Sequence, residues 1–324
     1  RPGSKIDREA QVRGNSVYFP DRVVPMLPEK ISNDLCSLRE REERPCLAVR
    51  MIFDRNGEKR RHTFVRGMMR SAAKLSYQEA QAAIEGKPSD KCLPLMDKAL
   101  NPLWAAYKAV ATARDKRGPL DLDLPERRIE LDEKGKVARV VTPERLEAHR
   151  LIEEFMIQAN VAAAETLEEK KLPLVYRVHD APSPEKLKGL REFLESLDMK
   201  VPHAGALKPE AFNTVLEQAK TLPVPDLISE VILRSQSQAE YTPKNIGHFG
   251  LNLVRYAHFT SPIRRYADLI VHRALIRALG LGPDGLTDDE IPLLASIAKA
   301  ISDAERRAMA AERETTDRLI AAHL

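Results

Sequence analysis

Hydrophobic and polar residues alternate along the first part of the chain, as expected for β-strands with one buried face. Such runs precede a Pro-Asp turn at 20–21 (NSVYF) and flank an Asn-Gly turn at 56–57 (CLAVRMIF and RRHTFVRGMM). Asn-Gly between two alternating runs is a strong hairpin signal. Residues 1–75 are therefore predicted to be rich in antiparallel strands, arranged as a meander. A further hairpin is predicted where RRIELD and KVARVV flank Glu-Lys-Gly at 133–135.

Apolar residues recur at helical spacing from Tyr77 onward, and residues 143–324 are mostly helical in pattern. The segments predicted as helices are 78–86, 93–114, 143–170, 183–197, 209–220, 226–235, 262–279 and 288–323. The combined pattern predicts an α+β fold, with an antiparallel sheet surrounded by many helices and a long C-terminal helix. The Pro-containing joints are short, so a single domain over 1–324 is expected.

Composition and charge restrict the function only slightly. The 324 residues are 43% hydrophobic and 31% charged, an ordinary globular composition. With 52 Lys and Arg against 48 Asp and Glu, the net charge of +4 does not by itself indicate nucleic-acid binding, so any RNA path must be a local patch. Three cysteines without disulfide or zinc spacing fit a reducing cytoplasm.

No membrane-spanning run or targeting peptide is recognisable in the sequence. No apolar stretch approaches the roughly 18 residues that a membrane span needs. The first residues, RPGSKIDREA, resemble neither a signal nor a transit peptide and contain no initiator Met. We therefore expect the chain to be excised from a longer protein and to make no membrane contact.

The segment YAHFTSPIRRYADLIVHR, residues 256–273, combines a helix start with basic and aromatic residues. Ser261 is a favourable N-cap and Pro262 suits the first helical position, so a helix is predicted to begin at about Ser261. Arg264 and Arg265 would then lie in the first turn, where the helix dipole disfavours a cation by roughly 0.3–1 kcal/mol. Free amides and guanidinium groups together favour binding of a phosphate or a nucleic-acid backbone.

Two interpretations of these arginines are open. In the first, an arginine pairs with the nearby acid Asp268 while the other is solvated, and this is favoured for Arg265. In the second, the arginine binds phosphate, and this is favoured for Arg264. Aromatic residues interleave with the basic ones in a pattern suited to base stacking: Tyr256, Phe259 and Tyr266.

The longest motif, HFGLNLVRYAHFTSPIRRYADLIVHRAL, resembles the signature of the RNB family of ribonuclease II and exoribonuclease R type enzymes. Further segments agree with the family in the same order: RGNSVYFPDRVVPMLPEKISNDLCSL, KLSYQEAQ, IEEFMIQAN, YRVHDAPSPEKL and MAAERETTDRLIAAHL. The similarity covers essentially the whole chain. RVHDAPSP and HFTSPIRRY are closer to the exoribonuclease R side of the family.

The resemblance implies a monomeric 3′ to 5′ exoribonuclease core that hydrolyses single-stranded RNA to nucleoside 5′-monophosphates with Mg²⁺. The family's metal ligands lie in an Asp-rich motif, which is expected upstream of Arg1, so no metal ligand is assigned within this chain. Asp121 and Asp123 have a D-x-D spacing, but the leucines that alternate with them favour a strand with one polar face. The family's flanking cold-shock and S1 domains are likewise expected outside this chain.

Four residues match family positions with a role in RNA contact. Arg264, in SPIRR, matches the arginine at the scissile phosphate. Tyr18, in SVYFP, matches the aromatic residue that packs on the terminal nucleotide and sets the final product size. Tyr77, in KLSYQ, and Glu153, in IEEF, match residues implicated in sensing the ribose. For Tyr77 and Glu153 an ordinary structural role is an almost equally good interpretation. For Tyr18 the residues alone favour a strand tyrosine on a half-buried face.

Further positions are less defined. Glu312, in AAERE, matches a glutamate near the family's active site whose role is unassigned, and Arg265 is included among the RNA-contacting residues. A second stacking aromatic of the family falls near 120–124, where only leucines supply apolar side chains. The histidines of this region lack metal-ligand spacing and are expected to be structural: His248, His258 and His272.

Two alternatives to an active exoribonuclease are open. A catalytically inactive RNA-binding RNB module would keep the fold without the metal-binding aspartates. A helical interaction domain organised by the last helix would not explain why two adjacent arginines occur in SPIRR. The residues that precede Arg1 in the complete protein distinguish the first alternative from the enzyme.

Overall fold

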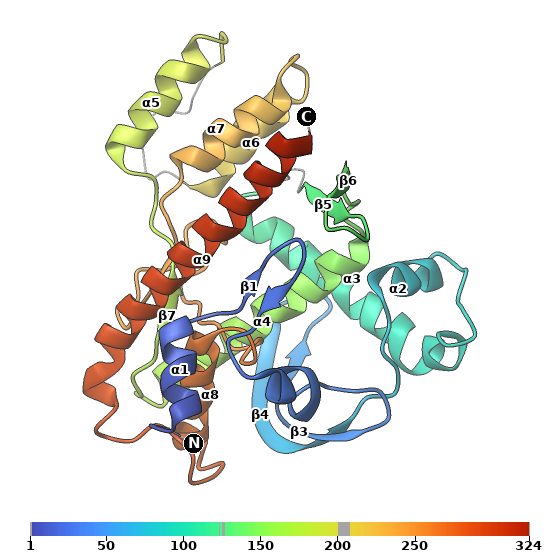
Figure 1. Ribbon diagram of the computed structural model, residues 1–324, viewed down its shortest axis with the longest axis vertical. Coiled ribbons are helices and arrows are strands. Elements are labelled where there is room, and N and C mark those ends of the chain that lie inside the picture. Colours follow the sequence, from blue (N-terminus) through green and yellow to red (C-terminus); the bar gives the residue numbers. More distant parts are fainter. Residues whose placement is uncertain (1, 123, 125–126, 200–207, 324) are drawn as a thin grey trace.

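The computed structural model describes residues 2–122, 124, 127–199 and 208–323 (Figure 1). It is a mixture of helices and short antiparallel sheets, which confirms the predicted α+β class and the long C-terminal helix. The helices are α1 (Lys5–Arg13), α2 (Tyr77–Ile84), α3 (Asn101–Arg117), α4 (Glu147–Glu169), α5 (Pro184–Glu195), α6 (Pro209–Ala219), α7 (Pro225–Ser235), α8 (Tyr266–Leu279) and α9 (Leu294–His323). Short helical turns lie at Lys30–Leu35, Leu93–Leu95, Met96–Leu100 and Ile291–Leu293.

The strands of the described residues form two-stranded antiparallel sheets and not one meander. They are β1 (Val17–Tyr18), β2 (Val23–Val24), β3 (Glu43–Phe53), β4 (Lys59–Arg70), β5 (Arg128–Leu131), β6 (Val137–Val141), β7 (Tyr176–Val178) and β8 (Glu240–Thr242). The two predicted hairpins are confirmed, because β3 pairs with β4 and β5 with β6, and β1 also pairs with β2 across the predicted turn at 20–21. The fourth pair, β7 with β8, was not predicted, since three-residue strands far apart in sequence carry little pattern.

Local sequence signals account for several helix ends. α2 begins at Tyr77 as predicted, because Ser76 and Glu79 form a capping box in which each side chain accepts the other's backbone N–H. α3 ends at Gly118, which adopts a left-handed conformation with φ 63°. The strand expected over residues 120–124 is not formed by the described residues of that segment. Instead, the Asp121 N–H donates to Asn213 Oδ1 at 2.9 Å, while Asp123 lies outside the described residues.

Helix α4 is the centre of the larger of two apolar cores (Figure 1). Residues 162–164 are consecutive alanines with 0% exposure, so α4 is covered on more than one face. The core also includes buried residues of α8, α9, β7 and β8. Each large apolar side chain buried in it contributes about 1.5–3 kcal/mol.

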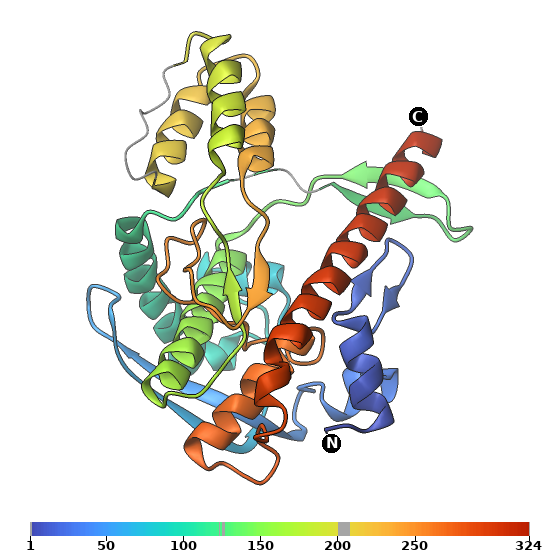
Figure 2. The same ribbon diagram turned by 90° about the vertical axis from the view of Figure 1, so that its left-hand side faces the viewer.

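A second, smaller core joins α5, α6 and α7, which stand together at the top of Figure 2. Leu190, Phe212 and Ile228 are buried at its centre, and Leu120 and Phe249 pack against it from the body of the protein. In the same view the β5–β6 hairpin reaches the C-terminal part of α9, which it contacts through β6. Among the described residues, no helix is both long and apolar enough to cross a bilayer.

Two histidines, each in its neutral form, hold the 247–251 segment in place. His179 Nδ1 accepts the Gly250 N–H at 2.9 Å and its Nε2 bonds to the Ser237 carbonyl oxygen at 2.8 Å. His248 Nδ1 accepts the Leu251 N–H at 3.2 Å. Protonation of either Nδ1 would place two N–H groups against each other. The structural role expected for His248 agrees with these contacts.

Acid is expected to destabilise the protein through His248. Burial lowers the pKa of His248 to about 3, whereas an unfolded histidine titrates near about 6.5. Between these values the unfolded state binds more protons, so the free energy of unfolding falls as the pH is lowered from 6.5, by about 1.4 kcal/mol per pH unit. Urea unfolding at pH 7 and pH 5 measures this loss, which should be about 2 kcal/mol smaller in His248→Asn. His323→Asn, at the exposed end of α9, is the matched control, and an equal pH dependence in His248→Asn and wild type would contradict the prediction.

Candidate nucleic-acid interface

The predicted helix start at Ser261 is wrong, because α8 begins at Tyr266 and Arg265 is its N-cap in an extended conformation (φ −138°, ψ 125°). The Arg264 and Arg265 amides both donate to the Ser261 carbonyl oxygen, at 3.2 and 3.1 Å, which makes 261–265 a separate turn. Two contacts favour this conformation, and the second of them is long-range. The Ser261 N–H donates to Asp268 Oδ1 at 2.7 Å, and the Tyr266 N–H donates to the Gly14 carbonyl oxygen at 2.8 Å. Arg264 therefore lies outside the helix, and the dipole argument does not apply to it.

The two arginines of this turn differ in environment. Arg265 contacts Asp268 with Nε at 2.8 Å and Nη2 at 2.9 Å, which confirms the pairing favoured from the sequence. Burial would lower the pKa of Arg265, but the Asp268 carboxylate outweighs it and raises that pKa. Arg264 is exposed, and its side chain makes no hydrogen bond or ion pair within the described residues. A contact of Arg265 with RNA stays a prediction, and its guanidinium is already engaged with Asp268.

The aromatic residues that interleave with these arginines are buried, so the base-stacking interpretation is wrong for all three. Tyr256 is 7% exposed and its hydroxyl accepts from Asn160 Nδ2 at 2.9 Å. Phe259 is 5% exposed and packs edge-on against Phe64. Tyr266 is 3% exposed and donates its hydroxyl to an α1 carboxylate, that of Asp7. The sequence spacing did not reveal that these side chains point inward.

Tyr18 and Glu312, which lie 294 positions apart, are in direct contact. The Tyr18 N–H donates to Glu312 Oε1 at 2.7 Å, which attaches β1 to the C-terminal half of α9. Tyr18 as a residue is 47% exposed, so its side chain can contact a ligand. The Arg264 turn is adjacent, because the Ser16 N–H donates to the Arg264 carbonyl oxygen at 3.0 Å. Four of the predicted site residues therefore belong to one region: Tyr18, Arg264, Arg265 and Glu312.

Tyr77 and Glu153 belong to a second region, at the beginning of α4. The Tyr77 ring is 42% exposed and stacks on His149 with 3.9 Å between ring centroids. Glu153 lies one helical turn beyond His149 and pairs with Arg145 at 2.6 Å. The sequence analysis missed His149 and Arg145. The i to i+4 spacing of His149 and Glu153 was the available signal for a shared face.

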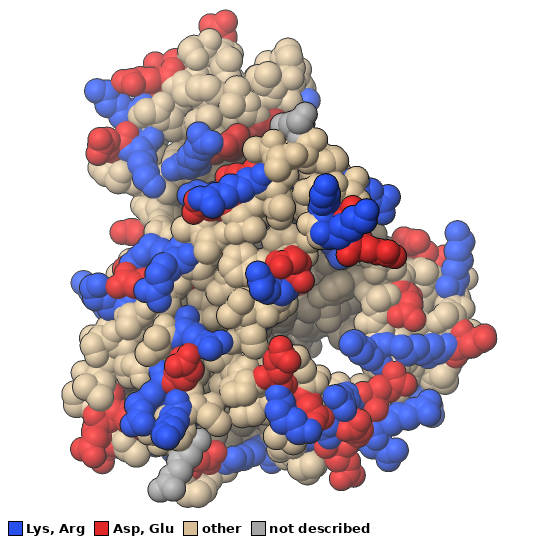
Figure 3. Space-filling model, viewed as in Figure 1, with Lys and Arg blue, Asp and Glu red and all other residues tan. Residues whose placement is uncertain are grey.

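The two regions border a hollow in the molecular surface. In Figure 3 the surface is recessed above α4, between the β1–β2 hairpin, the β5–β6 hairpin and α2. Positive and negative residues are interspersed over this face, in line with the small net charge of +4. The hollow is therefore not a uniformly basic groove. Among the described residues Arg264 has no carboxylate partner, a property that it shares with other exposed arginines such as Arg307 and Arg313 of α9.

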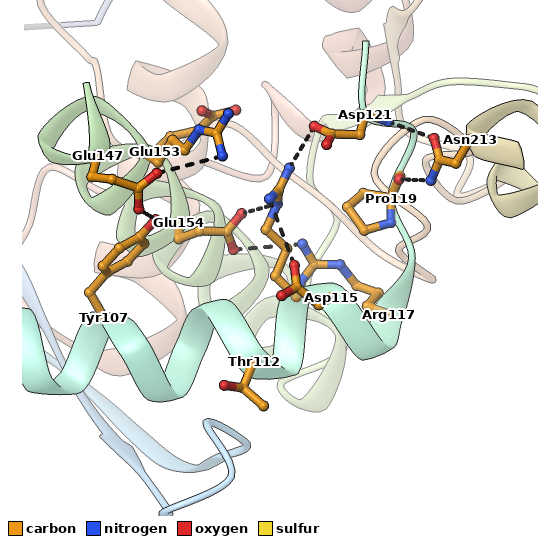
Figure 4. Close-up of polar contacts among 12 residues, drawn as sticks. Tyr107, Thr112, Asp115, Arg117, Pro119, Asp121, Glu147, Glu153, Glu154 and Asn213 are labelled. Carbon is orange, nitrogen blue, oxygen red and sulfur yellow. Dashed lines mark hydrogen bonds and ion pairs between the residues drawn. The ribbon is translucent and has the colours of Figure 1, made fainter. Parts of the chain in front are cut away.

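A buried network of charges lies next to Glu153 (Figure 4). Glu154 is 3% exposed and contacts Arg114 Nε at 3.1 Å and Arg117 Nη2 at 3.7 Å. Burial raises the pKa of Glu154 although both arginines oppose the shift. Arg114 also contacts Asp121 at 3.1 Å, and the Arg117 Nε donates to the Leu251 carbonyl oxygen at 3.1 Å. The network joins the end of α3, the beginning of α4 and the 247–251 segment.

Cavities match the predicted site only in part. A small cavity of about 80 Å³ is lined by Glu153, Arg145 and the Glu154 network. A larger one of about 540 Å³ lies between the start of β4 and the ends of α4 and α8, and its described lining contains none of the predicted RNA-contacting residues. For RNA contact we give more weight to the smaller cavity, because one of the predicted residues, Glu153, lines it.

No cluster of three or more His, Cys, Asp or Glu residues in the described parts of the chain is arranged to hold a metal ion. The residues that would suit Mg²⁺ are carboxylates arranged around a common centre. Asp121 is instead paired with Arg114, and Glu153 with Arg145. The described residues thus do not fit a Mg²⁺ site, and the expected position of the metal ligands upstream of Arg1 stays a prediction.

Comparison with known proteins gives a consistent family. A model of the RNB domain matches residues 1–280. Ribonuclease R of Aquifex aeolicus is 41% identical over 325 residues, which cover 100% of this chain and 46% of the relative. Ribonuclease R of Escherichia coli strain K12 is 37% identical, over 98% of this chain and 40% of the relative. The chain thus spans less than half the length of these relatives.

Solved structures agree with the sequence relatives. The apo form of Mycoplasma genitalium RNase R superposes with a TM-score of 0.93 at 31% identity, over 99% of this chain and 51% of that one. The same enzyme in complex with ribose methylated single-stranded RNA gives a TM-score of 0.92. Yeast Ssd1, a pseudonuclease, has a TM-score of 0.72 at 20% identity, over 95% of this chain and 38% of that one, and shows similarity of fold alone.

Proposed function

Because the chain belongs to the RNB domain family, we propose that it forms the core of a hydrolytic exoribonuclease that shortens single-stranded RNA from its 3′ end to nucleoside 5′-monophosphates. The observation that supports this most directly is the exposed Arg264 guanidinium, which has no ion pair or hydrogen bond within the described residues and adjoins β1 with Tyr18. Since the chain covers under half of its relatives, substrate and product are proposed for the complete protein.

In this proposal Arg264 binds the phosphate that is cleaved. A guanidinium can offer two parallel N–H donors to phosphate oxygens. Negative charge on those oxygens changes during hydrolysis, and a fixed cation stabilises the transition state when it is aimed at the developing charge. The absence of a carboxylate partner among the described residues leaves the whole guanidinium available for this role.

Tyr18 is proposed to stack on the base of the terminal nucleotide. Its half-exposed side chain offers an aromatic face on which any base can stack. The site would therefore select single-stranded RNA without preferring a base sequence. Glu312 then has a definite role, because its hydrogen bond to the Tyr18 N–H fixes the strand that carries the ring.

Tyr77 and Glu153 are proposed to contact the ribose of an incoming nucleotide. A phenol and a carboxylate can donate to and accept from a 2′-hydroxyl, which distinguishes RNA from DNA. Glu153 is held near the opening of the small cavity by Arg145, and Tyr77 is held by its stacking on His149.

We further propose that the complete enzyme requires Mg²⁺, held by an Asp-rich segment that precedes Arg1. Bound Mg²⁺ supplies an activated water and neutralises charge on the phosphate. A second candidate function is an RNA-binding module without catalysis. It is favoured by one observation, the lack of a carboxylate cluster among the described residues.

The two functions are separated by an assay on the purified protein whose intact mass is compared with 36.4 kDa, the mass of the printed sequence. 5′-labelled single-stranded RNA is incubated with Mg²⁺, with and without EDTA. EDTA-sensitive shortening from the 3′ end supports the exoribonuclease. RNA that is bound and stays full-length, in a protein of larger mass that includes the preceding aspartates, would overturn it in favour of the binding module.

A further inference from the structure

The backbone that carries Arg264 is held by buried side chains and not by regular secondary structure. Residues 259–264 belong to neither a helix nor a strand. The three consecutive N–H groups of 259–261 all donate to side chains of helices α4 and α8. The amides of Arg264 and Arg265 donate to the Ser261 carbonyl oxygen. A loop fixed in this way depends on the few residues that accept those bonds.

The first of these residues is Asn160, on α4. It is 2% exposed, and its Oδ1 accepts the Phe259 N–H at 2.8 Å and the Thr260 N–H at 3.3 Å. Its Nδ2 donates to the Tyr256 hydroxyl at 2.9 Å. The side-chain oxygen of Asn160 thus accepts two hydrogen bonds from the loop. Its side-chain nitrogen binds Tyr256, which precedes the loop.

The second is Asp268, on α8. It is 0% exposed, and its Oδ1 accepts the Ser261 N–H at 2.7 Å and Arg265 Nη2 at 2.9 Å. Its Oδ2 accepts Arg265 Nε at 2.8 Å. A buried carboxylate needs both charge compensation and hydrogen bonds, and here Arg265 gives the first and the loop amide adds to the second. Asn160 therefore holds the amides of residues 259 and 260, and Asp268 holds the amide of residue 261.

We infer that Asn160 and Asp268 are positioning residues for Arg264, which hold the amides of 259–261 so that the guanidinium of Arg264 stays aimed at the phosphate. The inference rests on the proposed role of Arg264 in RNA hydrolysis. Asn160 lies two helical turns beyond Glu153, at a rise of about 10 Å along α4. Helix α4 therefore connects the ribose-contacting region to the loop that carries Arg264.

The geometric part is tested by amide hydrogen exchange in Asp268→Asn and, if that variant does not fold, in Asn160→Ala. Exchange at 259–261 is expected to accelerate about tenfold or more, while the amides of α9 keep their protection. Thr166→Val is the matched control, since Thr166 is also a buried polar residue of α4, bonded to His62 and not to the loop. Unchanged exchange at 259–261 would overturn the inference, whatever the activity of the protein.

The functional part is tested by a double-mutant cycle in the complete protein. Asp268→Asn alone is expected to lower kcat about 10- to 100-fold with KM changed less than about threefold, because displacement of a catalytic group affects the transition state most. In the Arg264→Ala background the same change should lower kcat less than about twofold. Equal losses in both backgrounds would overturn the inference, whereas a wild type that never shortens RNA would overturn the proposed function instead.

Discussion

Arg264→Ala is expected to lower kcat for RNA shortening by about 100- to 1000-fold, the usual effect of removing one preorganised donor to a transition-state oxygen. RNA binding should weaken far less, because many other contacts hold the strand. The physical reason is the isolation of this guanidinium: it is exposed and has no carboxylate partner among the described residues. Single-turnover kinetics and an RNA-binding titration on the same preparation measure the two quantities separately.

The controls for this prediction test charge and geometry. Arg264→Lys keeps the charge without the two-pronged donor and should fall between wild type and Arg264→Ala. Arg306→Ala removes another exposed arginine, one already paired with Asp303, and should leave kcat within about twofold. If Arg264→Ala lowered RNA affinity and kcat/KM by the same factor with kcat unchanged, Arg264 would be a ground-state binding residue.

Glu154→Ala is expected to lower the free energy of unfolding by about 3–5 kcal/mol, because it leaves Arg117 without its carboxylate in a buried environment. The Arg117 side chain is only 16% exposed, and burial already lowers the pKa of Arg117. The adjacent residue provides a matched control. Glu153→Ala removes a carboxylate that is 48% exposed and should cost about 0–1 kcal/mol.

Urea unfolding of the two variants measures this difference. A loss of equal size in Glu153→Ala and Glu154→Ala would mean that the buried network contributes no more than a surface pair. The network joins α3, α4 and the 247–251 segment. We therefore also expect the backbone amides of 247–251 to exchange hydrogen faster in Glu154→Ala under conditions where the protein stays folded.

Sequence patterns were sufficient where structure depends on neighbouring residues. The Asn-Gly turn at 56–57 is a local signal and predicted the β3–β4 hairpin. Apolar spacing from Tyr77 onward predicted α2, whose start is capped by Ser76 in the structure. Ser261 also has the chemistry of an N-cap, yet α8 starts later. Its amide is bonded to Asp268, and Tyr266 is bonded to Gly14, more than 250 positions away in sequence. The local preference for a helix start at Ser261 is overridden here by the contact with Gly14, which forms only in the assembled fold.

The same limit applies to the candidate site. The resemblance to the family supplied Tyr18, Tyr77, Glu153, Arg264 and Glu312, but not their arrangement. Nothing in the periodicity indicates that Glu312 contacts the backbone of Tyr18, or that the aromatics near Arg264 point into the core. The Arg265–Asp268 pair was predictable because its partners are three residues apart.

The contact between Tyr18 and Glu312 couples the site to the order of synthesis. Strands β1 and β2 have two residues each, which is too short for a hairpin to be stable alone. It is attached through Glu312, which lies 294 positions later in the sequence. A chain still on the ribosome has released Tyr18 long before Glu312, and a long-range contact can form only when both of its partners have emerged. The aromatic residue proposed to hold the RNA end therefore reaches its final position only after α9 has been synthesised.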